Sequence, residues 1–136
     1  AYSDDLMEWS APNVLMEGRE EWESLKIGGS CPPLRTDAGW LHIYHGVATK
    51  DKGRGYCAGA VLLDLENPEK ILARTKQPIL EPTEACERSG IYKGCVFPTG
   101  NVIHDGTLYV YYGAADTYVC VATAALDEFL NDLVAE

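Results

Sequence analysis

The sequence predicts an all-β fold, made of about two four-stranded antiparallel units and followed by a short C-terminal helix. Short runs of strand-forming residues alternate with Gly, Pro and Asp turns along nearly the whole chain. Two stretches repeat the same order of elements: a strand containing Gly and Pro, a tight turn, an aromatic strand and a further strand. The spacing of apolar residues becomes helical only near the C-terminus.

Residues 21–76 are predicted to form the first unit. Its candidate strands lie, in order, in the runs SLKIGGSCPPLRT, WLHIYHGVA, YCAGAVLLDL and KILART. Turn residues separate these runs, including the segment DKGRG at 51–55. Because the run NVLM lies before them, residues 1–20 are predicted to form an outer strand of a preceding unit.

Residues 90–126 are predicted to form the second unit, after a loop-like segment at 76–93. The runs GCVFPTGNVIH, TLYVYYGAAD and YVCVATAAL are its strands, and Asp105-Gly106 between the first two predicts a hairpin. Residues 127–136 are predicted to be a helix, because DEFLNDLV has helical apolar spacing and begins with acidic residues, which the N-terminal end of a helix favours.

The aromatic strands of the two units resemble each other and indicate how the units pack. WLHIYHG and LYVYYGA each end at Gly, and bulky side chains fall on both faces of each strand. Strands with this pattern are typically buried on both sides. Repeated four-stranded meanders stacked face to face are typical of a β-propeller. A small sandwich or a half-open barrel fits the same pattern.

Composition and charge exclude several classes of function. The chain has 136 residues and a net charge of −10, which argues against nucleic acid and anionic membranes as partners. No apolar run approaches the ~20 residues that cross a bilayer, and the opening AYSDDLMEW has no signal-peptide pattern. Five cysteines without a CxxC pair predict reduced thiols, no metal site and a cytoplasmic protein. They are Cys31, Cys57, Cys86, Cys95 and Cys120.

Several longer strings are more specific than this periodicity. They are KIGGSCPPLRTDAGWLHIYHGV, YCAGAVLLDLENPEKILART, VFPTGNVIHDGTLYVYYGAAD and the opening AYSDDLMEW. In this order, and over nearly the whole chain, they resemble the C-terminal portion of glycoside hydrolase family 130. The resemblance implies a partial five-bladed β-propeller that binds a β-mannoside on its axis. It also implies cleavage by inorganic phosphate, giving mannose 1-phosphate, with hydrolysis in some members and no other cofactor.

The resemblance also implies roles for five side chains. Lys26 and His45 match basic residues that line the phosphate pocket, and Tyr56 matches a tyrosine near them. Asp116 matches an acidic residue that binds sugar hydroxyls, and Phe97 matches an aromatic wall of the sugar site. The general-acid Asp of the family and its phosphate-binding Arg residues belong to earlier blades, so the resemblance leaves the catalytic residues of this chain unknown.

Each of these residues also has a structural interpretation. Lys26 fits a solvated strand-edge lysine, His45 a core histidine bonded to a carbonyl, and Asp116 the start of a turn. Cys86 stands where the family has an aromatic residue, before Glu87. This departure leaves the local sugar contact open.

Three hypotheses for function follow. In the first, the chain is the C-terminal fragment of a β-mannoside phosphorylase or hydrolase, inactive alone because the general acid is absent. In the second, it is a non-catalytic partial propeller that covers its open faces by homo-oligomerisation or with a missing N-terminal half. In the third, it binds sugar without catalysis.

Overall fold

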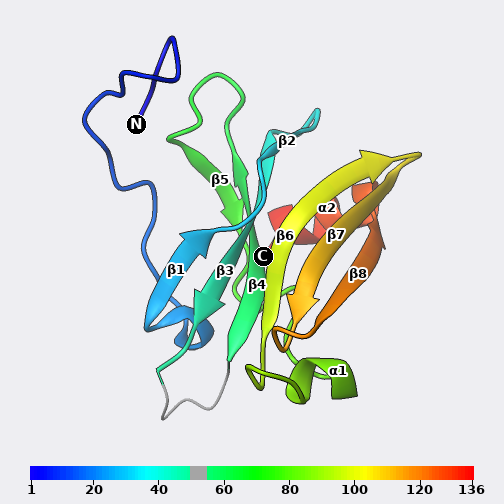
Figure 1. The fold of residues 1–136 in the computed structure, drawn as a ribbon. Coiled ribbons are helices and arrows are strands. Elements are labelled where there is room, and N and C mark those ends of the chain that lie inside the picture. The colour runs from blue at the N-terminus through cyan, green and yellow to red at the C-terminus, as the bar shows by residue number, and fades with distance from the viewer. Residues whose placement is uncertain (50–54) are drawn as a thin grey trace.

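A computed structural model describes residues 1–49 and 55–136 of the chain. The predicted turn at 51–55 lies, apart from Gly55, outside the described residues. Figure 1 shows two sheets side by side, with the C-terminal helix behind them. Within the described part, no helix is both long and apolar enough to cross a membrane.

The first sheet is antiparallel and contains β1 (Lys26–Gly29), β2 (Leu34–Arg35), β3 (Trp40–Val47), β4 (Tyr56–Leu63) and β5 (Ile71–Arg74). The strand order is β1-β3-β4-β5, and β2 also pairs with β3. Strands β1 and β2 pair with opposite ends of β3, so together they take the place of one edge strand. The segment 30–33 interrupts this strand. The sheet thus has the four strand positions that the sequence predicts.

The second sheet has the order β6 (Val96–His104), β7 (Thr107–Ala114), β8 (Tyr118–Ala125), all antiparallel. Asp105 and Gly106 join β6 to β7 with φ values of 47° and 70°, as a tight Asp-Gly hairpin requires. The prediction of a fourth strand here is wrong for the described chain. Strand β8 continues directly into helix α2 (Leu126–Ala135), and no strand within residues 1–49 and 55–136 pairs with its outer edge.

Two short helices and the N-terminal segment complete the chain. The 3₁₀ helix η1 (Glu21–Glu23) precedes β1, and α1 (Ala85–Arg88) lies within the segment predicted to be a loop. The backbone of 1–20 forms no strand, because the described chain offers it no strand of a preceding blade to pair with. Its assignment to such a blade therefore stays a prediction.

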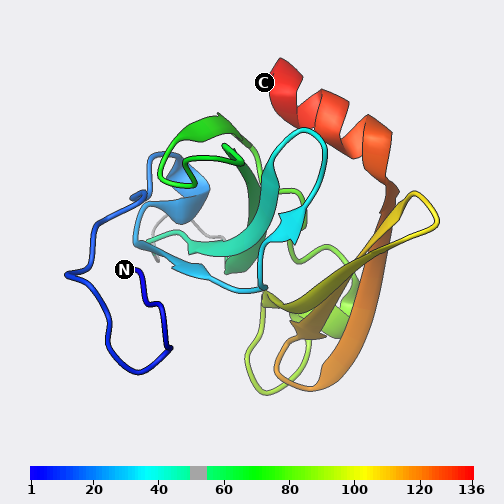
Figure 2. The ribbon, with the colours of Figure 1, turned by 90° about the horizontal axis from the view of Figure 1, so that it is seen from above.

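The main core lies between the two sheets and is closed by α2. Ile43 and Leu62 of the first sheet pack in one cluster with Leu108 and Val110 of β7 and with Leu133 of α2. Figure 2, seen from above, shows α2 along one side of this arrangement, where it contacts β4, β5 and β8. Burial of apolar side chains in this core stabilises the packing of the two sheets by about 25 cal/mol for each Å² of apolar area removed from water.

Burial confirms the two-sided prediction for the first sheet and corrects it for the second. The aromatic strand β3 buries Ile43 on one face and Tyr44 on the other, and the neighbouring β4 is buried at every position from Cys57 to Leu63. Strand β7 instead alternates, with Leu108 and Val110 buried and Tyr111 exposed, because no further sheet packs on the other face in the described chain. The second sheet therefore carries an open face.

An ionic network attaches η1 to the outer face of the first sheet. Arg74 of β5 and Glu23 form an ion pair of 2.8 Å, with 5% and 0% of their side chains exposed. The Tyr44 hydroxyl donates to Glu23 Oε2 at 2.9 Å and accepts from Arg74 Nε at 3.1 Å. The Trp22 ring packs beside Tyr44, at 5.8 Å between centroids. Every charge in the network thus has a directional partner, as a buried pair requires.

A second buried carboxylate fixes α1 against the second sheet. Glu87 Oε1 accepts a hydrogen bond of 2.8 Å from the hydroxyl of Tyr112. Its other oxygen, Oε2, accepts hydrogen bonds from the backbone N–H groups of Thr83 and Glu84, each at 2.7 Å. Glu87 is 4% exposed, and these bonds make it a structural cap of α1.

We expect Tyr112→Phe to lower the free energy of unfolding by about 1.5–3 kcal/mol, because it leaves one oxygen of a buried carboxylate without its donor. Urea denaturation measures the change. The matched control is Tyr111→Phe, on the exposed face of the same strand. The control should stay within ~0.5 kcal/mol. Equal effects of the two variants would contradict the role given to the Glu87–Tyr112 bond.

Candidate active site

Three of the predicted site residues lie on one face of the first sheet, at one end. Lys26 and Tyr56 both pair with Val47 of β3, from opposite sides, and His45 lies two residues earlier on β3, paired with Gly28. Paired residues in a sheet project to the same face, and so do residues two apart in a strand. Lys26, His45 and Tyr56 therefore share the face that is turned toward the second sheet.

A close backbone contact brings the second sheet to this end. Tyr56 N donates to Gly94 O at 3.1 Å, and Tyr56 forms a parallel bridge with Cys95. Gly55 permits this approach, because a Cβ on it would stand only 1.6 Å from Gly94 O. As a result, the Phe97 ring lies 4.7 Å from the His45 ring and 5.6 Å from the Tyr56 ring, between centroids.

Lysine and aromatic side chains meet at this junction. Lys26 Nζ lies 5.1 Å from the centroid of the Tyr56 ring, and Tyr92 approaches Tyr56 edge-on at 5.5 Å. A hydrogen bond to Tyr56 raises the pKa of the Lys26 ammonium above its ordinary value, so Lys26 is a fixed positive charge at neutral pH. We call Lys26, His45, Tyr56, Tyr92 and Phe97 the Lys26 cluster.

His45 is the most constrained member of the Lys26 cluster. Its Nδ1 is 3.0 Å from Ser30 Oγ, in the segment that interrupts β1 and β2. Burial, and then the positive charge of Lys26, lower the pKa of the imidazole below its ordinary value. The ring is therefore neutral at pH 7, and Lys26 alone supplies the formal positive charge of the cluster. Ser30 replaces the carbonyl partner that a core histidine was expected to have.

Gly28 gives the His45 ring its room. A Cβ at position 28 would stand 2.6 Å from Cε1 of His45, closer than real side chains approach. We expect Gly28→Ala to displace the ring, to shift the imidazole signals of His45 in NMR spectra and to destabilise the fold by about 1–3 kcal/mol. Gly100→Ala is the control, because nothing lies within 4 Å of the added Cβ. An unchanged His45 spectrum in Gly28→Ala would contradict this packing.

Asp116 does not join the Lys26 cluster. It is exposed in the β7–β8 turn, with φ 52°, and within the described residues no hydrogen bond or ion pair joins its side chain to the cluster. It lies at the same end of the second sheet: the neighbouring Ala115 O accepts from Tyr92 N at 3.0 Å. After burial, its charge further raises the pKa of the Cys95 thiol, which reaches about 11. Its sugar-binding role stays a prediction.

Sequence reasoning missed two residues of the junction, Ser30 and Tyr92. Ser30 stands in the string KIGGSCPPLRT, in which no role was given to its hydroxyl, and Tyr92 lies in a segment with no strand pattern. His42 and His104 stay outside the cluster: His42 is on the opposite face of β3, and His104 is exposed beside Asp105.

All five cysteines are free. No group of three or more metal-ligating side chains occurs within residues 1–49 and 55–136.

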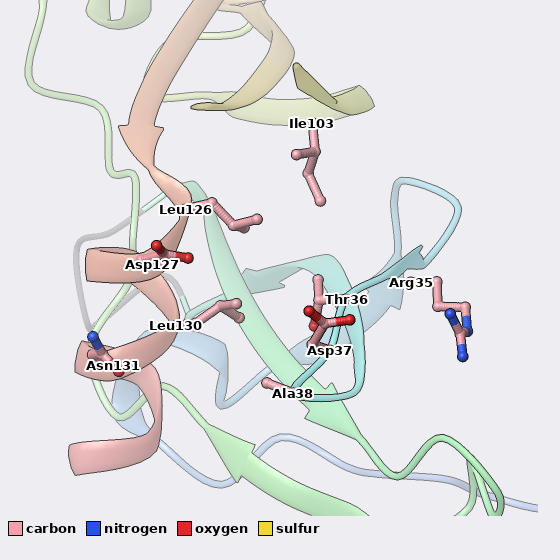
Figure 3. A pocket seen from close by; sticks show the side chains of 9 residues that line it. All are labelled: Arg35, Thr36, Asp37, Ala38, Ile103, Leu126, Asp127, Leu130 and Asn131. Carbon is pink, nitrogen blue, oxygen red and sulfur yellow. The ribbon is translucent and has the colours of Figure 1, made fainter. Parts of the chain in front are cut away.

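A pocket of about 610 Å³ lies at the other end of the sheets (Figure 3). The β2–β3 turn, the end of β6 and α2 form its walls. Asp37 and Asp127 place two carboxyl groups there, and the Arg35 side chain extends away from the other labelled residues. With no cation directed inward, this pocket does not suit an anionic ligand. The Lys26 cluster does carry a positive charge, and its role as an anion site stays a prediction.

Two adjacent antiparallel meanders with a shared core define a segment of a propeller-type protein. The sequence profile of glycoside hydrolase family 130, described as beta-1,4-mannooligosaccharide phosphorylase, matches residues 1–135. The chain belongs to this family. The predicted fold, a partial β-propeller with a short C-terminal helix, is confirmed.

The most informative relatives are phosphorylases. The chain is 46% identical over 123 residues to a 1,2-beta-oligomannan phosphorylase of Thermoanaerobacter sp. (strain X514), covering 90% of this chain and 40% of that enzyme. It is 33% identical over 131 residues to a beta-1,4-mannooligosaccharide phosphorylase of Ruminococcus albus, covering 95% and 39%. The beta-1,2-mannobiose phosphorylase of Listeria innocua, solved with beta-1,2-mannobiose, superposes with a TM-score of 0.77 at 42% identity, covering 85% and 32%. The chain thus spans about two fifths or less of each relative.

Proposed function

We propose that this chain supplies the phosphate-facing side of the active site of a β-mannoside phosphorylase. One observation carries the proposal: a fixed ammonium, a half-buried imidazole and a phenol converge with an aromatic ring at the junction of two sheets. Family membership supports the reading of this cluster as an anion site. The other walls of the site belong to propeller segments outside this chain.

In the proposed reaction, an oxygen of inorganic phosphate bonds to the anomeric carbon of the mannosyl unit as the bond to the leaving sugar breaks. The leaving oxygen takes a proton from a general acid outside this chain, and the product is mannose 1-phosphate. Lys26 balances the charge of phosphate, and His45 and Tyr56 offer hydrogen bonds to its oxygens. Phe97 covers an apolar face of the sugar, and Asp116 accepts from its hydroxyls.

A calorimetric titration with inorganic phosphate tests the anion site in the purified chain. We expect saturable binding with one site per chain, weaker than in a complete enzyme because the remaining cations are missing. Chloride at equal ionic strength is the control for unspecific screening. The proposal would be contradicted if the heats of binding measured with phosphate were no larger than those measured with chloride.

The chain alone should not release mannose 1-phosphate from a β-mannoside and phosphate, because the general acid lies elsewhere. A discontinuous assay for mannose 1-phosphate, with and without phosphate, measures this. Phosphate-dependent release by the isolated chain would contradict the placement of the general acid outside it.

Self-association is a second candidate function, and the open face of the second sheet favours it. On this face Tyr111 and Val121 pair with each other, and Val119 is 84% exposed at the edge strand β8. An unpaired edge next to exposed apolar side chains promotes association. We propose that a second copy of the chain covers this face. Sedimentation velocity tests it: a dimer that Val119→Lys converts to monomer supports the proposal, and a monomer at all concentrations contradicts it.

A further inference from the structure

Ser30 and His45 form a pair that the phosphate site described above does not yet explain. The Ser30 hydroxyl is the sole partner of His45 Nδ1 among the described residues, at 3.0 Å, and Nε2 has no hydrogen-bond partner there. A neutral imidazole carries one proton, on either nitrogen, and the bond made by one nitrogen decides the role of the other. The hydrogen bond with Ser30 therefore determines whether Nε2 donates a hydrogen bond to a ligand or accepts one.

The orientation of the ring is fixed on three sides. Gly28 lies against the edge that carries Cε1 and Nε2, with a virtual Cβ at 2.6 and 2.7 Å from these atoms. The Phe97 ring packs at 4.7 Å between centroids, tilted by 34°. Ser30 holds Nδ1 from the interruption between β1 and β2. A half turn of the ring about its Cβ–Cγ bond would put Cδ2 in the place of Nδ1 and would lose the contact with Ser30.

The titratable neighbours favour a neutral ring. Lys26 on β1 disfavours a second positive charge on the ring. The other titratable groups on this side are the phenols of Tyr56 on β4 and of Tyr92 in the loop before β6. Burial acts in the same direction on the pKa of His45. A neutral ring beside an anion contributes most when it donates from the nitrogen that faces the anion.

We propose that Ser30 donates its hydroxyl proton to Nδ1 of His45 and thereby fixes the tautomer with the proton on Nε2, so that the neutral ring acts as a hydrogen-bond donor in the anion site. Ser30 is thus a positioning residue that acts through His45 and does not itself contact the ligand. The use of this donor for phosphate rests on the proposed function, whereas the tautomer is a property of the free chain.

Nitrogen-15 NMR of the histidine side chains tests the tautomer directly. The chain has three histidines, so His45 is assigned by its loss in His45→Gln. At pH 8 we expect the His45 spectrum of the Nε2-protonated tautomer, and in Ser30→Ala a mixture of the two neutral forms. Ser30→Thr, which keeps the hydroxyl, should restore the single tautomer. The control Ser10→Ala, in the N-terminal segment, should leave the spectrum unchanged.

A Nδ1-protonated His45 in the native chain, or an unchanged spectrum in a folded Ser30→Ala variant, would overturn the inference. In the phosphate titration we expect Ser30→Ala to weaken binding about three- to tenfold, the usual effect of losing one well-placed hydrogen bond, and Ser30→Thr to recover most of it. Failure of the native chain to bind phosphate would count against the proposed function alone. The tautomer measurement, made without phosphate, decides the inference in either case.

Discussion

Replacing Glu23 by Ala should lower the free energy of unfolding by about 3–5 kcal/mol, the largest effect we expect from a single substitution in this chain. Glu23 is fully buried, and its carboxylate takes the Arg74 guanidinium at 2.8 Å and the Tyr44 hydroxyl at 2.9 Å. Removing it leaves the Arg74 charge buried without its counter-ion. It also frees the segment that leads into η1, because the backbone N–H groups of Arg19 and Glu20 donate to the same carboxylate. Chemical denaturation measures the change.

Two further variants separate the buried charge from the lost contacts. Lys70→Ala breaks the exposed Lys70–Asp64 pair of 3.6 Å and should cost no more than ~1 kcal/mol. The double variant Glu23→Leu with Arg74→Met should recover much of the stability lost in Glu23→Ala, because it removes both charges and keeps apolar volume. A Glu23→Ala variant within ~1 kcal/mol of the native chain would contradict the account of this network.

Replacing Lys26 by Met should weaken phosphate binding at least tenfold, because hydrogen bonds to charged groups contribute about 1.5–3 kcal/mol each. Burial and Lys26 itself keep His45 neutral, so no other group of the Lys26 cluster carries a positive charge at pH 7. Met keeps the approximate length and the apolar stem of the Lys26 side chain beside Tyr56, so the variant measures the effect of removing the ammonium group. The titration that detects phosphate binding to the native chain measures the loss.

Lys70→Met is the matched control, because Lys70 is exposed and pairs with Asp64 away from the cluster. It removes the same net charge and should leave the affinity unchanged within error. Equal losses in the two variants would show that phosphate responds to overall charge, and would contradict a site at Lys26. The thermal transition of both variants should stay close to that of the native chain, since both side chains are exposed.

The parts of the fold that were predictable depend on local signals. Asp105-Gly106 predicts its hairpin because few residues accept positive φ, and Leu126–Ala135 is helical where the apolar spacing changes. The run SLKIGGSCPPLRT was predicted as one strand, and the sequence could not reveal its division into β1 and β2, because the pairing of both with β3 is a tertiary property. Helix α1 was missed because its four residues are too few for a periodic pattern.

The candidate site was predictable in its residue types and less so in its geometry. The family motifs named Lys26, His45, Tyr56 and Phe97, and the structure brings these four together. Their meeting depends on the Tyr56–Cys95 bridge between residues far apart in the chain, which no local pattern encodes. The same bridge positions the loop that carries Tyr92. Asp116 was named by the same motifs, yet it lies in an exposed turn outside the Lys26 cluster.

The most direct test of the central claim is the response of the three histidine side chains to inorganic phosphate, followed by NMR. His45 belongs to the Lys26 cluster, His42 lies on the opposite face of β3, and His104 is exposed at the far end of β6. We predict a saturable shift of the His45 signals that disappears in Lys26→Met, with His42 and His104 unchanged. Shifts that are equal at all three, or that persist without the Lys26 ammonium, would contradict an anion site at the junction of the two sheets.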